Sequence, residues 1–149
     1  MMRNSIIKCV LLILLAVGIS CGQKANCAGK GVFRAQDSLR QYGGWRVINK
    51  FYRLYKNCEN VYTTEAFSAA IVKALAERWD SLPEMQRFTA ADSAFLDFVL
   101  RRIDATARAE HLKKILANTE KCPKGCENLC GRIRKRTSAA LAAAVDVHE

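Results

Sequence analysis

Apolar residues recur every three or four positions along much of the chain, which is the spacing of one face of an α-helix. Between residues 33 and 56 the pattern is interrupted by Gly43 and Gly44. We therefore expect a short helix followed by a longer one. The apolar face of the longer helix holds Trp45, Ile48, Phe51, Tyr52 and Tyr55.

The next amphipathic segment should begin near Thr63 or Thr64, either of which can cap a helix N-terminus. Pro83 should stop it, because proline cannot continue a helix. Its apolar stripe holds Phe67, Ala70, Ile71, Ala74, Leu75 and Trp79.

Two further helices are expected before the C-terminal cysteines. The segment Thr89 to Asp92, TAAD, resembles a capping box with Asp in place of Glu. The helix after it would bury Phe95, Phe98, Val99 and Ile103. Another would run from about Thr106 to Asn118 and bury Leu112, Ile115 and Leu116.

The last part of the chain predicts a short basic helix over LCGRIRKR and then an Ala-rich tail. We expect the tail, residues 137–149, to fray, because its methyl groups bury little area. No Val/Ile/Thr-rich run of strand length alternates apolar and polar residues. The predicted fold is therefore all-α: a small, disulfide-stapled bundle of five or six short helices over residues 33–136.

The first twenty residues have the pattern of an export signal. Arg3 and Lys8 accompany ten uncharged, mostly apolar residues, Val10 to Ile19. A spanning helix needs about 20 apolar residues, so this run predicts a cleaved signal peptide, with an uncleaved anchor as the alternative. Residues 21–32 are Gly-rich and polar, and we expect them to form a flexible tether.

The leader ends at Cys21 in VGISCG, which resembles the lipobox of bacterial lipoproteins. It departs from the usual pattern at Gly18, where Leu is commoner. In that family the cysteine becomes the mature N-terminus and carries diacylglycerol, so the resemblance implies lipidation at Cys21. Several acyl chains anchor stably, since each buried methylene adds about 0.8 kcal/mol.

The residue after Cys21 is Gly22, not the Asp that signals inner-membrane retention in enteric bacteria. The periplasmic face of a Gram-negative outer membrane is therefore the expected location. The alternative is ordinary cleavage after Ser20 or Gly22 and simple secretion.

Seven cysteines shape the expected stability of the mature chain. Cys9 leaves with the leader and Cys21 carries lipid, so we interpret Cys27, in the tether, as the unpaired residue. Four thiols then remain in the folded part, and an oxidising compartment predicts two disulfides among them. Three pairings are open for Cys58, Cys122, Cys126 and Cys130.

The cluster CPKGCENLC also permits a metal or redox interpretation. Structural zinc sites usually pair cysteines as CxxC, and this spacing is CxxxCxxxC with no histidine nearby. Disulfides are the better prediction, with a turn at Pro123 and Gly125. We expect no metal and no cofactor.

The net charge of +10 is unevenly distributed. Gly22 to Lys56 holds eight Lys or Arg and one acid, and Arg132 to Arg136 adds four more basic residues. If folding joins these segments, they form one basic binding surface for an acidic protein or an anionic membrane. Nucleic acid is not expected outside the cytoplasm, and no nucleic-acid motif is present. The predicted surface is Arg46, Lys50, Arg53, Lys56, Arg132, Arg134, Lys135 and Arg136.

No catalytic residue is predicted. His111 and His148 are the only histidines, and the first has the neighbours of an ordinary helix surface. No nucleophile elbow, zinc-protease, P-loop or dinucleotide motif occurs. Carboxylates that could serve glycoside hydrolysis fall at capping or surface positions: Glu65, Glu77, Asp80 and Glu84.

The sequence therefore predicts an exported, lipid-anchored, helical binding protein that is not an enzyme and acts by non-covalent recognition. One concrete form, by analogy of class alone, is an immunity protein that caps a toxin. The alternatives are a structural envelope lipoprotein that binds anionic lipid or cell wall, and an enzyme that uses carboxylates.

Overall fold

The computed structural model describes residue 27, residues 29–58 and residues 60–146 of the 149-residue chain. The predicted signal peptide, the lipidation site Cys21 and His148 lie outside these residues. The described part is all-α, as the periodicity predicted. Its seven α-helices are one or two more than expected.

The glycine pair separates the first two helices, as predicted. α2 spans Lys30–Tyr42 and α3 spans Trp45–Tyr55. Gly43 has φ +27°, and its N–H donates to the carbonyl of Leu39, which ends α2. α2 begins three residues before residue 33, so it includes the last residues of the predicted flexible tether.

α4, Val61–Glu77, is the central helix and packs against α2, α3 and α7. Its N-cap is Asn60, whose side chain accepts a hydrogen bond from the Thr63 N–H at 2.9 Å. The prediction of a cap at Thr63 or Thr64 was wrong, because both threonines already lie inside the helix. α4 also ends at Glu77, well before Pro83.

The segment after α4 holds a helix that the sequence analysis missed. A 3₁₀ turn, η1 at Trp79–Ser81, leads into α5, Leu82–Ala91, with Pro83 in its first turn. Proline is favoured there because the first N–H groups of a helix have no partner within the helix. Pro83 therefore begins a helix here.

α6 spans Ser93–Arg101 and is capped by Asp92, which accepts hydrogen bonds from two of its first N–H groups. The predicted capping box placed the cap at Thr89, but that residue lies within α5. α6 supplies Phe95 and Phe98 to an aromatic cluster at the centre of the core. Tyr52 of α3 lies 4.9 Å from both rings, measured between centroids, and Phe67 of α4 lies 5.0 Å from Phe98.

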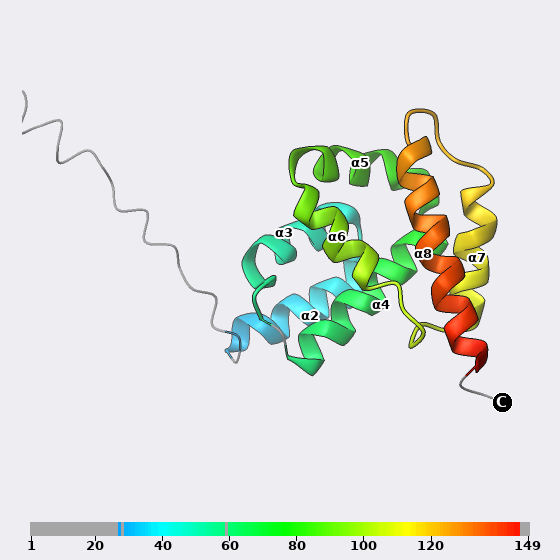
Figure 1. The fold of residues 1–149 in the computed structure, drawn as a ribbon. Coiled ribbons are helices and arrows are strands. Elements are labelled where there is room, and N and C mark those ends of the chain that lie inside the picture. The colour runs from blue at the N-terminus through cyan, green and yellow to red at the C-terminus, as the bar shows by residue number, and fades with distance from the viewer. Residues whose placement is uncertain (1–26, 28, 59, 147–149) are drawn as a thin grey trace, which may run out of the picture.

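The last two helices lie side by side (Figure 1): α7 at Ala109–Thr119 and α8 at Glu127–Asp146. α8 runs without a break through the Ala-rich segment, with Thr137 and Ala140 buried. The expected boundary at residue 136 is therefore not a structural boundary. Small side chains here allow close packing of α8 on its neighbours.

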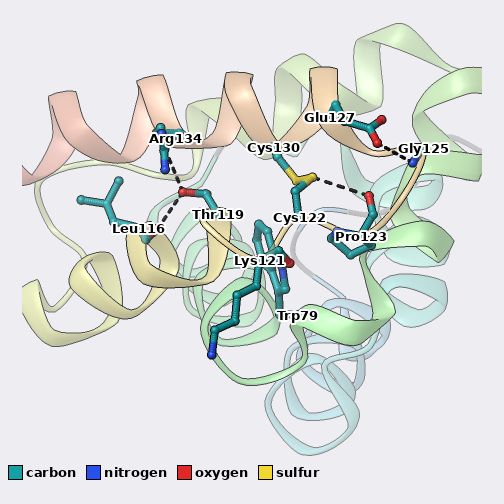
Figure 2. The surroundings of a disulfide bond; sticks show 10 residues. All are labelled: Trp79, Leu116, Thr119, Lys121, Cys122, Pro123, Gly125, Glu127, Cys130 and Arg134. Atoms are coloured by element: carbon teal, nitrogen blue, oxygen red, sulfur yellow. Dashed lines mark hydrogen bonds between the residues drawn. A yellow bond between two sulfur atoms is a disulfide. The ribbon is translucent and has the colours of Figure 1, made fainter.

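Hydrogen bonds tie this α7–α8 pair to α4. Asn118 donates from Nδ2 to the carbonyls of Leu75 and Ala76 at 2.9 and 3.1 Å. These carbonyls are at the C-terminal end of α4, where helix carbonyls lack partners within the helix. Trp79 donates from Nε1 to the carbonyl of Lys121 at 2.9 Å, beside the disulfide between Cys122 and Cys130 (Figure 2).

Candidate functional site

The predicted basic surface is divided in the structure. Its first half lies on α3 and its second half on α8. α6 packs against both helices, through the Tyr52–Phe95 ring contact on one side and against α8 on the other. Figure 1 shows α6 between α3 and α8.

The α8 half is largely occupied by contacts within the protein. Arg132 pairs with Asp97 at 3.1 Å, and Arg134 pairs with Glu120. Arg136 donates from Nε to the carbonyls of Leu100 and Ile103 at 3.1 and 2.8 Å, close to the C-terminal end of α6. Three of the four basic residues of this half therefore hold α8 to its neighbours.

Arg134 illustrates this structural use in Figure 2. Its Nε donates to the Thr119 hydroxyl at 3.1 Å, and that hydroxyl donates to the carbonyl of Leu116 at 2.6 Å. The guanidinium therefore satisfies groups at the end of α7. Lys135, between these arginines, is exposed.

The α3 half is more available. Lys50 and Arg53 are exposed, and within the described part of the chain neither makes a hydrogen bond or ion pair. Lys56 lies with Nζ 5.2 Å from the centroid of the Tyr52 ring, a cation–π contact that leaves the residue exposed. Arg46 is paired with Glu84 at 3.5 Å, but its side chain remains 86% exposed. The predicted binding surface is thus reduced to the α3 face.

Burial explains the electrostatics of Tyr52, beneath this face. Its side chain is buried in the aromatic cluster, and this raises the pKa of its hydroxyl; the nearby Asp92 carboxylate raises it further. Tyr52 is therefore a neutral core residue.

The first disulfide corrects the prediction for Cys27. Cys27 is bonded to Cys58, with their Cα atoms 5.3 Å apart, so it is not the unpaired residue. Its carbonyl also accepts a hydrogen bond from Asn60 Nδ2 at 3.3 Å. The chain just before α2 is therefore fixed to the α3–α4 connection, and residue 27 is not part of a free tether.

The second disulfide joins Cys122 to Cys130, and Cys126 between them is a buried free thiol. The prediction that Cys126 pairs was wrong. The turn predicted at Pro123 and Gly125 is present: Gly125 has φ +82°, and the Cys126 N–H donates to the Pro123 carbonyl at 3.0 Å. This turn brings Cys122 back to α8, which a continuous helix could not do.

The chemistry of the cysteine cluster follows from this pairing. Two of the three sulfurs are bonded to each other, so they cannot serve as thiolate ligands for a metal. Burial raises the pKa of the Cys126 thiol, and the charge of Glu127 raises it further. The Gly125 N–H donates to the Glu127 carboxylate at 2.9 Å and lowers the pKa of that carboxyl (Figure 2). Cys126 is therefore a protonated, weakly nucleophilic core residue.

An open cleft of about 610 Å³ lies between α4, the start of α7 and the loop before α7. The sequence analysis did not find it, because its lining comes from two segments that lie far apart in the sequence. Charged residues of both signs border it, with small and apolar residues between them. The ionisable lining residues are Glu65, Lys73, Glu77, Arg108 and His111.

Two of the four carboxylates considered for catalysis, Glu65 and Glu77, lie in this cleft. They are twelve residues apart on one helix, which separates them by about 18 Å along its axis. The paired carboxylates of glycoside hydrolases lie about 5 to 9.5 Å apart. Glu84, as described above, pairs with Arg46, and Asp80 is exposed in η1.

His111 is partly buried at this cleft. No hydrogen bond or ion pair of its side chain occurs within the described residues. A general base is oriented by a hydrogen-bonded partner, so the described residues give no support for a base at His111.

Comparisons with known proteins found no matching family model, no similar curated protein and no similar solved structure. Across residues 27, 29–58 and 60–146, every helix is too short or too polar to cross a bilayer.

Proposed function

We propose that this protein is an exported, lipid-anchored binding protein that recognises an acidic partner through the exposed face of α3. The observation that carries the proposal is the unequal use of the two basic segments. Arginines on α8 form ion pairs with carboxylates and hydrogen bonds with carbonyls. Lys50 and Arg53 on α3 are exposed and form no ion pair or hydrogen bond within the described residues.

Export is supported by two independent features of the chain. The leader has the charge and length of a signal peptide, and it ends at the lipobox-like Cys21. Four cysteines of the folded part form two disulfides, and disulfides persist in oxidising compartments such as the periplasm. One version of the function is immunity-type capping of a toxin that carries an acidic surface.

The proposal assigns non-covalent recognition and no catalysis. It rests on the separation of Glu65 from Glu77 and on the lack of an orienting partner for His111 within the described residues. Because Glu65 and Glu77 line the cleft beside α7 and do not belong to the α3 face, a substitution of either glutamate should leave partner binding unchanged.

The export and anchoring part is tested by the intact mass of the mature protein, with and without reduction. We expect an N-terminal residue at Cys21 carrying acyl mass, and two disulfides in the folded part. A mature chain that begins at Gln23 without lipid would contradict the anchor and favour simple secretion.

The recognition part is tested by charge reversal on α3. Arg46→Glu with Lys50→Glu should abolish a one-to-one complex with the partner recovered from the envelope by crosslinking. The matched control is Lys113→Glu with Lys114→Glu on the exposed face of α7, which changes the net charge equally. Equal loss in both variants would show that only overall charge matters, and it would sink a specific α3 surface.

A second candidate function is that of a structural envelope lipoprotein that binds anionic lipid. The observation in its favour is a group of exposed apolar side chains among cations at one end of the molecule.

A further inference from the structure

Four exposed apolar side chains are gathered at three helix ends. Phe33 is in the first turn of α2, Leu54 in the last turn of α3, and Val61 and Tyr62 begin α4. Their exposed fractions are 59%, 51%, 67% and 72%, respectively. Among the described residues, Tyr42 at the opposite end of α2 is the one other large apolar side chain with comparable exposure, at 58%.

These three turns meet at one place, which we call the disulfide end: the first turn of α2, the last turn of α3 and the first turn of α4. The Cys27–Cys58 bond and the Asn60–Cys27 hydrogen bond join the chain on either side of them. A Cβ added at Gly31 would lie 3.0 Å from the Tyr55 hydroxyl, so α2 and α3 are in close contact there. Figure 1 shows the starts of α2 and α4 at the same end of the molecule.

The charge of the disulfide end is positive. Lys30 and Arg34 extend from α2, and Arg53 and Lys56 extend from α3; all four are exposed. The three turns themselves contain no Asp or Glu, and the sequence places one acid, Glu59, in the α3–α4 connection. Exposed aromatic and aliphatic side chains interleaved with Lys and Arg are the composition of surfaces that lie in a membrane interface.

The short chain between the lipid site and the disulfide end indicates that the bilayer is the surface that covers the disulfide end. Six peptide steps separate Cys21 from Cys27. Fully extended, they span about 20 Å. The disulfide fixes Cys27 to this end, so an acylated Cys21 keeps this end within about 20 Å of the bilayer.

From these observations we infer that the disulfide end docks on the anionic bilayer to which the chain is tethered. Phe33, Leu54 and Tyr62 enter the boundary between headgroups and acyl chains. The four cations contact lipid phosphates, to which long Lys and Arg side chains reach while their stems stay among apolar groups. The inference rests on the lipid anchor of the proposed function. In this inference Arg53 and Lys56 contact the membrane, and Arg46 and Lys50 on the rest of the α3 face bind the protein partner.

The test uses the acylated protein in vesicles that contain 30% phosphatidylglycerol, compared with pure phosphatidylcholine vesicles. Tyr62→Trp places a reporter at the disulfide end, and Tyr42→Trp is the matched control, an equally conservative change at an exposed tyrosine elsewhere. Trp45 and Trp79 are buried, and their signal is subtracted with the unsubstituted protein. Quenching by lipids with brominated acyl chains reports contact with the boundary region.

We expect the tryptophan at position 62 to be quenched and blue-shifted on the anionic vesicles, and the one at position 42 to be unaffected. Quenching at position 62 should fall with salt and on phosphatidylcholine. Each cation near an anionic surface contributes about fivefold to binding. Lys30→Gln with Arg34→Gln should therefore lower the ratio of docked to undocked protein about 25-fold, whereas Lys113→Gln with Lys114→Gln should not.

Equal quenching at the two positions, or none at position 62, would overturn the inference. So would shielding of position 62 by an envelope protein in the absence of lipid contact, which would make the occupant a protein. Mass spectrometry of the same samples separates this result from failure of the anchor. If no acyl chain is found, the soluble mature protein is added to the same vesicles, and quenching at position 62 still decides whether this end binds lipid.

Discussion

The two disulfides should contribute unequally to stability, and the difference is large enough to measure. In the chain-entropy model a cross-link stabilises by restricting the unfolded chain, more so for longer loops. The Cys27–Cys58 bond closes a sequence separation of 31 residues, which corresponds to about 3.7 kcal/mol. The Cys122–Cys130 bond closes a separation of 8 residues, which corresponds to about 2.5 kcal/mol.

Packing does not obscure this comparison. Each pair has one buried member, Cys58 at 6% exposure and Cys130 at 5%, and one member that is more accessible. Cys122 is less exposed than Cys27 and packs against the core. Any loss of packing is therefore larger for the second pair and cannot produce the predicted order. The difference of about 1.2 kcal/mol should come from loop length, and it corresponds to a few degrees in Tm.

The assay is urea denaturation followed by circular dichroism at 222 nm, on the unsubstituted protein and the two double-alanine variants. We expect Cys27→Ala with Cys58→Ala to lower the free energy of unfolding more than Cys122→Ala with Cys130→Ala. The reverse order, or a negligible effect of the longer loop, would refute the view that the first bond closes the fold entropically. A typical domain has a total stability of about 5–15 kcal/mol, so either loss is substantial.

Three other predictions concern groups whose role only the structure reveals. Arg136→Ala should lower the free energy of unfolding by about 1.5 kcal/mol, because it removes a charged donor from carbonyls near the end of α6. Arg132→Ala should lower it by less than about 0.5 kcal/mol, because the ion pair with Asp97 is exposed. Chemical denaturation of the two variants compares these losses. Asn118→Ala should cost about 2 kcal/mol by leaving two carbonyls of α4 without a donor. Asn128→Ala, at an exposed site, is the control in the same denaturation experiment. The thiol of Cys126 should resist iodoacetamide at pH 7 until the protein unfolds, as peptide mapping would show. Because its pKa in the folded protein is raised above the ordinary value of 9.0, the unfolded chain loses this proton first. Stability should therefore be unaffected by this group below pH 9 and fall as pH rises above it; a Cys126→Ala variant with the same alkaline loss as the parent would contradict this assignment.

Local features of the chain were sufficient to predict every described helix except α5. Helical periodicity depends on contacts three and four residues apart, so the stripe around Phe67 to Leu75 could be identified from the sequence alone. Gly43 and Gly44 mark a break because glycine accepts a backbone conformation that few other residues adopt. The N-cap residues were predicted wrongly. The caps are Asn60 and Asp92, and each lies three residues from a predicted cap. Several polar residues near a helix start have side chains that can cap it, and the sequence does not distinguish among them.

Partners distant in sequence decided the rest. Cysteine composition and an export leader predict disulfides, but the choice of Cys27 over Cys126 depends on which thiols the folded helices bring within bonding distance. An arginine looks the same in sequence whether its guanidinium meets water or the carbonyls of another helix. The sequence by itself therefore determined a helical, disulfide-bonded fold with an excess of positive charge. Only the packing of α6 and α8 decided which of those charges remain free, because a side chain's partners are set by the positions of neighbouring elements.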